Sequence, residues 1–270
     1  MVAFDTDVLV VGAGFGGLGA ALRLAERGHR VTLCESLRYP GGCASTFQRR
    51  GHRFEAGATL FSGFGEGQLF ERWIKRHQID VTLDWLDPVV EVRGGDLELA
   101  VPATRAALIE RVSALPGAEP RKVQAFFAEQ RRVADRLWGL FDDPALLPPF
   151  GAKALLTHLR RSPGYLPLLR WVGRPLTALL DKHGLGHVTA LRTYLDALCQ
   201  ITVQCGAAEA EAPFALATMD YYFRGTAHVR HGIGALATGL ADAIARAGGE
   251  VRFSTRVKGL APVDGGWRAE

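Results

Sequence analysis

The first part of the chain alternates between continuous apolar runs and helical spacing. Residues 8–11 are apolar at every position, which is typical of a central parallel strand covered on both faces. Four apolar residues then recur at the spacing of one helix face: Leu18, Ala21, Leu22 and Ala25. Gly28 predicts the end of that helix, and residues 30–35 predict a second strand. The pattern therefore predicts a β-α-β unit of about 30 residues.

Helical spacing dominates the middle of the chain. Residues 121–141 predict a long amphipathic helix, and residues 188–204 and 210–222 predict two further helices. Residues 89–101 predict a short antiparallel hairpin that turns at Gly94-Gly95. The β-α-β pattern is thus interrupted by a mainly helical insert.

The opening pattern returns near the C-terminus. Apolar positions between 233 and 244 have helical spacing, Gly248-Gly249 predicts the end of that helix, and residues 250–255 predict a strand. We therefore expect an α/β fold in which a Rossmann-like domain with a parallel sheet is discontinuous along the sequence and resumes near residue 226.

Composition and charge narrow the class of protein. The chain has 270 residues, of which 48% are hydrophobic and 22% charged, as in a globular protein with a real core. The net charge of +4 is not concentrated in a long Lys/Arg run, and no nucleic-acid module is recognisable, so nucleic acid is not an expected partner. The basic excess is compatible with an anionic membrane surface or an anionic ligand.

Cysteine usage and the N-terminal region predict a cytoplasmic location. The four cysteines form no C-x-x-C pair and no metal-binding spacing with histidine, so reduced thiols and no metal are expected: Cys34, Cys43, Cys199 and Cys205. The uncharged stretch 8–22 follows the acidic residues Asp5 and Asp7 and is rich in glycine, which argues against a signal peptide. No stretch of about 20 apolar residues predicts a transmembrane helix.

The glycines after the first strand predict a dinucleotide site. Gly12, Gly14 and Gly17 have the G-x-G-x-x-G spacing between a strand and a helix. The first glycine permits a tight turn, the second lets a pyrophosphate approach the backbone, and the third lets the helix pack closely on the strand. The helix N-terminus then presents N–H groups to the anion. Glu35, at the end of the second strand, can accept hydrogen bonds from a ribose diol.

A second glycine pair favours FAD over NAD. Gly41-Gly42 follows Glu35 closely, and glycines there let the backbone approach another part of a larger ligand. The whole run 10–47, "VVGAGFGGLGAALRLAERGHRVTLCESLRYPGGCASTF", resembles the N-terminal signature of glutathione-reductase-type FAD proteins, in the branch with amine oxidases and carotenoid desaturases. That branch usually has an arginine where this chain has Cys43.

Two further segments extend the resemblance. Residues 54–65, "FEAGATLFSGFG", are similar to the family segment that passes the isoalloxazine ring. Residues 228–260 are similar to a segment of phytoene desaturases and carotenoid isomerases, with His231 where the family usually has glycine. The resemblance, together with the motif, implies these FAD-binding residues: Gly12, Gly14, Phe15, Gly16, Gly17, Glu35, Ser36, Gly41, Gly42, Cys43, Gly57, Ala58 and Val257.

The resemblance also implies a domain division. We expect residues 1–85 to be the first part of an FAD-binding domain, residues 86–225 a substrate domain that can face a membrane, and residues 226–270 the second part of the FAD-binding domain. The family is usually much longer, and its C-terminal half carries a Gly-Asp motif that closes over the flavin. Nothing in this chain matches that motif, so the resemblance implies an N-terminal fragment or a truncated gene product.

No catalytic residue is expected from residue type alone, because in such enzymes the flavin accepts the hydride. His52, His228 and His231 are candidates only through their proximity to the motifs. Cys43 lacks the paired cysteine that disulfide-reductase chemistry needs. Residues 144–180 contain five Lys/Arg and no acid. They are either a membrane-docking surface or an ordinary core helix with a solvated basic face.

The expected function is that of an FAD-dependent oxidoreductase that desaturates or isomerises an apolar isoprenoid or carotenoid-like lipid, with peripheral membrane association left open. One alternative is a non-catalytic protein of the same fold that resembles the GDP-dissociation inhibitors. A further alternative is an amine oxidase-type flavoenzyme.

Overall fold

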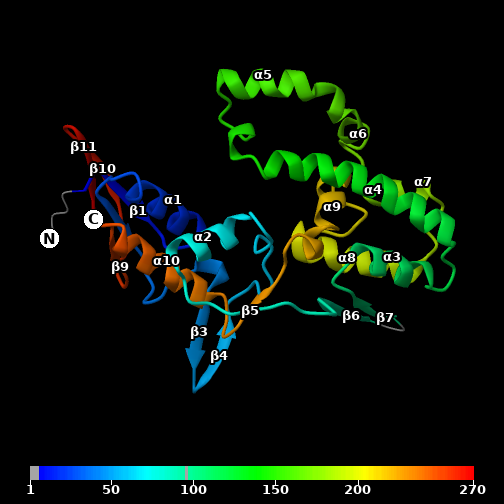
Figure 1. The fold of residues 1–270 in the computed structure, drawn as a ribbon, viewed down its shortest axis with the longest axis horizontal. Coiled ribbons are helices and arrows are strands. Elements are labelled where there is room, and N and C mark those ends of the chain that lie inside the picture. The colour runs from blue at the N-terminus through cyan, green and yellow to red at the C-terminus, as the bar shows by residue number, and fades with distance from the viewer. Residues whose placement is uncertain (1–5, 95–96) are drawn as a thin grey trace. The chain divides into compact units, whose positions relative to one another are not determined.

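The structure is a computed structural model that describes residues 6–94 and 97–270. It forms two compact units (Figure 1). The first, which we call the Rossmann unit, joins the described residues up to Trp85 to Gly225–Glu270. The second, the helical unit, is Leu86–Arg224. The assignment of these units to cofactor and substrate binding stays a prediction.

A parallel sheet with the strand order β1-β2-β9 organises the Rossmann unit. Its strands are β1 (Val8–Val11), β2 (Val31–Cys34) and β9 (Glu250–Arg252), and helix α1 (Phe15–Ala25) connects the first two. Val8 pairs with Val31, and Thr32 pairs with Glu250. The predicted α/β fold with a discontinuous parallel-sheet domain is therefore confirmed.

The expectation that β1 is covered on both faces is wrong. Every residue of β2 is buried, whereas β1 is only half-buried and Val11 is 54% exposed. The physical reason is position, because β2 lies between two strands while β1 pairs only with β2 among the described residues. The central strand of this sheet is the second strand of the sequence pattern.

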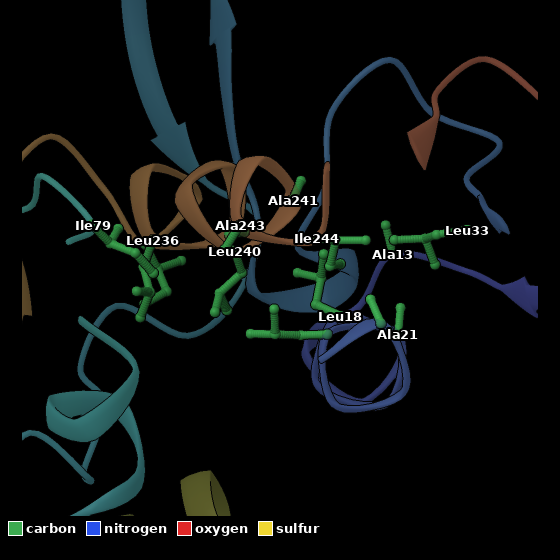
Figure 2. Packing of buried hydrophobic residues seen from close by; sticks show 14 of the residues in the cluster. Ala13, Leu18, Ala21, Leu33, Ile79, Leu236, Leu240, Ala241, Ala243 and Ile244 are labelled. Carbon is green, nitrogen blue, oxygen red and sulfur yellow. The ribbon is translucent and has the colours of Figure 1, made fainter. Parts of the chain in front are cut away.

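Helices α1 and α10 (Gly234–Arg246) pack against each other to form the core of the Rossmann unit (Figure 2). Leu18 and Leu22 of α1 and Leu240 and Ile244 of α10 are all at most 1% exposed. These are the apolar stripes that the periodicity predicts, and burying each such side chain stabilises the fold by about 1.5–3 kcal/mol.

A polar latch holds the N-terminus of α10. The antiparallel hairpin of β3 (Thr46–Arg49) and β4 (His52–Glu55) supplies both acceptors. The Glu55 carboxylate accepts the N–H of Ile233 at 3.0 Å, and the Thr46 hydroxyl accepts the N–H of Gly234 at 2.9 Å and donates to Glu55 at 2.9 Å. A Cβ on Gly234 would lie 2.9 Å from Thr46 Cβ, so glycine is needed for this approach.

Short elements complete the Rossmann unit. They are the 3-10 turn η1 (Gly42–Ala44), α2 (Leu69–His77), the strand pair β5 (Leu83–Asp84) and β8 (His228–Val229), and the hairpin of β10 (Leu260–Val263) and β11 (Gly266–Ala269).

The helical unit is built around α4 (Pro120–Phe141) and α9 (Ala212–Thr218). The predicted long helix is α4, and α8 (Thr189–Thr202) and α9 lie within the other two predicted ranges, so these predictions are confirmed. The predicted hairpin is formed by β6 (Val90–Gly94) and β7 (Leu97–Val101), although Gly95 of its expected turn lies outside the described residues.

The other helical elements follow the chain around this pair. They are α3 (Arg105–Ser113), η2 (Pro144–Leu146), α5 (Ala152–Arg161), η3 (Ser162–Tyr165), α6 (Leu166–Leu169), α7 (Thr177–Lys182) and η4 (Tyr221–Phe223). Over residues 6–94 and 97–270, none of the helices combines the length and the apolar character needed to cross a membrane.

Buried charges in the helical unit are paired. Glu129 accepts hydrogen bonds from Trp171 Nε1 at 3.2 Å and from His183 Nε2 at 2.9 Å, and it also pairs with Lys182. Burial raises the pKa of Glu129, but the Lys182 and His183 contacts outweigh it, so the pKa lies below its usual value. Removing one partner of such a buried pair is costly, so this cluster fixes α4 against the chain that follows α6.

We expect the substitution Thr46→Val to destabilise the protein by about 1–2 kcal/mol, because the Gly234 N–H loses its acceptor and the valine cannot replace it. Urea unfolding measures this change. The matched control is Thr193→Val, because the Thr193 hydroxyl donates to the Thr189 carbonyl within its own helix. Equal losses from the two variants would contradict the latch.

Candidate functional site

The first glycine loop contains two glycines that the protein itself requires. Gly12 has a φ of +98°, in the left-handed region, and its N–H donates to the Cys34 carbonyl at 2.7 Å. A Cβ on Gly17 would lie 2.0 Å from the Gly12 carbonyl oxygen, so only glycine lets α1 pack this closely on the loop. Conformation and packing explain both residues without any ligand.

Gly14 and Gly16 have no such internal reason to be glycine. A Cβ on either would meet no atom within 4 Å. Gly14 has a φ of −66° and a ψ of 168°, a conformation open to any residue. No side chain at its N-cap position closes the N-terminus of the eleven-residue helix α1. The loop is therefore an open cradle of backbone at a helix N-terminus, which suits an anion that approaches the main chain.

The second glycine pair lies against the first. Gly41 has a φ of +115° and donates its N–H to the Ala13 carbonyl at 2.8 Å. It also forms an isolated parallel β-bridge with Gly14. A Cβ on Gly42 would lie 3.2 Å from the Gly14 Cα. The two glycine segments that the sequence singles out are therefore in direct contact.

Cys43 and Gly57 continue this surface. A Cβ on Gly57 would lie 2.8 Å from the Cys43 carbonyl oxygen, so the predicted flavin segment passes directly over η1. Cys43 is exposed, and Ala58, which follows Gly57, is exposed as well. The four cysteines all lie in described parts of the chain and are free thiols.

The Glu35 carboxylate ties the loop to the end of β2. Glu35 is 7% exposed, and its Oε2 accepts the Ala13 N–H at 2.7 Å, while Oε1 accepts the Leu37 N–H at 2.8 Å and the Ser36 hydroxyl at 3.1 Å. An ionised carboxylate offers about four acceptor sites, so Oε2 keeps one for a ligand hydroxyl. Burial raises the pKa of Glu35, but these hydrogen bonds outweigh it and hold the pKa below its usual value.

A cavity of about 520 Å³ opens beside Glu35. The Thr255 N–H donates to the Glu35 carbonyl at 2.8 Å, which brings the segment after β9 alongside the end of β2. The cavity is lined by four predicted residues and five others: Gly12, Glu35, Ser36 and Val257, with Val11, Cys34, Thr255, Arg256 and Lys258. Arg256 and Lys258 were not predicted from the sequence as lining residues. The available signal was their position on either side of Val257, which was predicted.

Phe15 contributes differently from the other predicted residues. Its ring lies 5.9 Å from that of Phe61 and 5.6 Å from that of Phe70, so the side chain packs in an aromatic cluster. Of Phe15, only the backbone, in the first turn of α1, is available to the glycine cradle.

The candidate histidines do not line the cavity. His52 is exposed on β4, with its ring 6.5 Å from that of Phe54. His228 Nδ1 lies 3.0 Å from the Thr59 carbonyl oxygen, which joins β8 to the predicted flavin segment. His231 is exposed and has a φ of +70°, a conformation that favours glycine and in which histidine is tolerated. The structure assigns none of them a catalytic role.

Comparisons with known proteins agree with this geometry. Residues 10–76 match the family of NAD(P)-binding Rossmann-like domains. The phytoene desaturase (neurosporene-forming) of Cereibacter sphaeroides is 32% identical over 55% of this chain and 31% of its own. The all-trans-retinol 13,14-reductase of Homo sapiens is 26% identical over 94% of this chain and 42% of its own. A prolycopene isomerase of an Oncidium hybrid cultivar is 42% identical over 24% of this chain and 11% of its own.

Solved structures share the fold. An oxidoreductase from Methanosarcina mazei superposes with a TM-score of 0.62 at 18% identity, covering 97% of this chain and 54% of that one. A Rab GDI from Plasmodium falciparum superposes with a TM-score of 0.52 at 12% identity, covering 98% of this chain and 62% of that one. At these identities the likeness shows the fold alone.

The fold and the family match define a Rossmann-like domain of the NAD(P)-binding kind, matched over residues 10–76. The chain is homologous to phytoene desaturases and prolycopene isomerases. It spans less than half the length of these curated relatives.

We expect Glu35→Gln to cost about 1–3 kcal/mol of stability at neutral pH, because an amide cannot accept all the hydrogen bonds that the carboxylate accepts. The folded pKa of Glu35 lies below its unfolded value, so its stabilisation is present above about pH 4.3 and is lost as the pH falls through the folded pKa. The difference between variant and parent in urea unfolding should therefore shrink in acid. Glu250→Gln, at the exposed first position of β9, is the control, and a difference independent of pH would contradict this role.

Proposed function

We propose that this chain binds FAD and provides the cofactor-binding part of an oxidoreductase that acts on an apolar isoprenoid or carotenoid-like lipid. The observation that carries the proposal is the open backbone cradle at Gly14 and Gly16, where glycine has no use to the protein itself. The Glu35 cavity beside the cradle supports the same conclusion.

The residues present fit the central pyrophosphate and the adenosine end of a dinucleotide. The N–H groups at the start of α1 would hold the pyrophosphate, and Glu35 would accept from the ribose through its remaining Oε2 site. Val257 and its neighbours would border the adenine. The contact of Gly41-Gly42 with Gly14 favours FAD, because it extends the exposed backbone beyond the pyrophosphate toward Cys43 and Gly57.

When bound, FAD supplies a flavin ring that can accept or return a hydride. The chain's own residues would bind and orient it: Gly57 passes over the Cys43 backbone, and His228 contacts the Thr59 carbonyl two residues further along the same segment. The substrate class is supported by the homology with phytoene desaturases and prolycopene isomerases. Desaturation and isomerisation of such a lipid are both compatible with a hydride-accepting flavin, and the enzyme would work peripherally at a membrane in the cytoplasm.

Two alternatives use the same fold. A GDP-dissociation-inhibitor-like protein would bind a prenylated partner without FAD, but it would leave the glycines at positions 14 and 16 without a purpose. An amine oxidase-type flavoenzyme would use the same cradle. It is less well supported, because the sequence relatives named above act on retinoids and carotenoids.

We expect Gly14→Ala to weaken FAD binding at least tenfold, because the added methyl group occupies the space that the pyrophosphate needs. Titration of the purified chain with FAD, followed by flavin absorbance or fluorescence, measures this change. Gly139→Ala is the matched control, since a Cβ there also meets no atom within 4 Å and the residue also avoids the left-handed region. Both variants should remain folded.

A parent protein that binds no FAD would contradict the proposal and favour the GDP-dissociation-inhibitor-like alternative. FAD binding that Gly14→Ala leaves intact would contradict the placement of the pyrophosphate.

A further inference from the structure

The segment Phe150–Val172, which we call the arm, presents an apolar face to solvent. It comprises α5, η3 and α6. In Figure 1 α5 lies apart from α4, α8 and α9 of its own unit, whereas α6 returns to pack against α4. Its exposed apolar side chains are between 48% and 70% exposed: Phe150, Leu155, Leu156, Leu159, Leu166, Leu169 and Val172.

The exposed side chains form a helical stripe rather than a scatter. Ala152, Leu155, Leu156 and Leu159 have the spacing i, i+3, i+4, i+7, so they share one face of α5. On α4 the corresponding apolar stripe is buried, as Val123 and Phe126 are 0% exposed. On α5 the stripe faces outward, and the small residue Ala154 is buried instead.

Specific contacts hold the arm in this orientation. His158 lies on the inner side of α5, with Nδ1 2.9 Å from the Tyr165 hydroxyl and Nε2 3.0 Å from the Leu146 carbonyl oxygen. At the other end Trp171 is 2% exposed and donates to the buried Glu129. Because both ends are anchored by polar contacts, the leucine face is left outside by the fold itself.

The charges beside the stripe have one sign. Lys153 and Arg160 border the leucine face of α5, and Arg161 and Arg170 follow along the arm. Residues 144–180 contain no Asp or Glu. Within the described chain, no ion pair involves Lys153, Arg160 or Arg161. Long cationic side chains next to leucines can keep their charged ends at a phosphate layer while the leucines enter the acyl region.

We propose that the arm is a membrane-docking surface for anionic lipid bilayers, with the leucine stripe of α5 inserted and the flanking cations on the headgroup phosphates. The one-signed charge complements an anionic leaflet, and each cation near such a surface strengthens binding about fivefold. Docking there would bring an apolar substrate to the chain; this last link rests on the proposed function, whereas lipid binding does not.

Flotation of the purified 270-residue chain with vesicles tests the docking surface. We expect the parent to float with phosphatidylcholine vesicles that contain phosphatidylglycerol and to bind pure phosphatidylcholine much more weakly. The combined variant Lys153→Gln, Arg160→Gln and Arg161→Gln should lose roughly 100-fold in affinity. The matched control is Arg121→Gln, Arg132→Gln and Arg192→Gln, which removes the same charge from exposed positions elsewhere in the helical unit and should bind within a few-fold of the parent.

The leucine stripe is tested separately with Leu155→Ser, Leu156→Ser and Leu159→Ser, which should weaken binding at least roughly tenfold because less apolar area enters the bilayer. If that triple variant unfolds, Leu159→Ser alone, at the most exposed position, takes its place. The thermal midpoints of the charge variants should match the parent.

Three results would overturn the proposal. The first is a parent protein that does not float. The second is a control variant that loses as much affinity as the arm variant, which would mean that overall charge alone is responsible. The third is a leucine variant that abolishes self-association of the chain without affecting lipid binding. Flavin absorbance, read on the same samples, distinguishes failure of the docking surface from failure of the proposed function. A chain that binds FAD and does not float refutes only the docking surface, and a colourless chain that floats refutes only the proposed cofactor.

Discussion

The approach of helix α1 to the Gly12 turn is the constraint on which the rest of the Rossmann unit depends. With Gly17 at this position the helix packs so closely that a single Cβ would lie 2.0 Å from the Gly12 carbonyl. That closeness directs the uncapped start of α1 at the loop and lets Glu35 reach the Ala13 N–H. The cradle and the reach of Glu35 follow from this contact, whereas the cavity also needs the Thr255 hydrogen bond to the Glu35 carbonyl, which brings the segment after β9 alongside the end of β2.

Distances of this kind separate glycines that the fold requires from glycines that the fold does not explain. Gly12 and Gly17 are explained by conformation and packing, and Gly232 and Gly234 by the close approach of Thr46 to α10. Gly14 has no such explanation within the protein, which is why we propose that an anion occupies the open space before it. Motif spacing treats all the glycines alike, and only the distances to neighbouring atoms distinguish the two groups.

Local patterns in the sequence predicted the strands and helices well, because periodicity and capping act over a few residues. The pairing of the start of α10 with Glu55 could not be predicted, since the bond joins residues 178 positions apart and carries no local signal. The half-buried state of β1 was missed for a related reason, because an apolar run does not reveal whether a second neighbouring strand is present.

The arm is a second case in which local sequence patterns do not reveal burial. Helical spacing from Ala152 to Leu159 reveals an apolar stripe but not whether another element covers it, so the sequence alone left membrane docking and a core helix equally open. The polar anchors of His158 and Trp171 resolve the orientation, because they hold the other face of the arm inward. The residues expected to bind FAD are brought together along the cradle and its cavity, and their contacts with the cofactor stay predictions.

We propose that the cradle and the Glu35 cavity recognise the adenosine and pyrophosphate half of FAD. Competition binding tests it most directly, with the chain loaded with FAD and the displacement by ADP compared with that by FMN. ADP carries both groups that the site is built to hold, whereas FMN carries the flavin with neither the adenosine nor the pyrophosphate. We predict that ADP displaces FAD and that FMN does not. Displacement by FMN, with none by ADP, would contradict it.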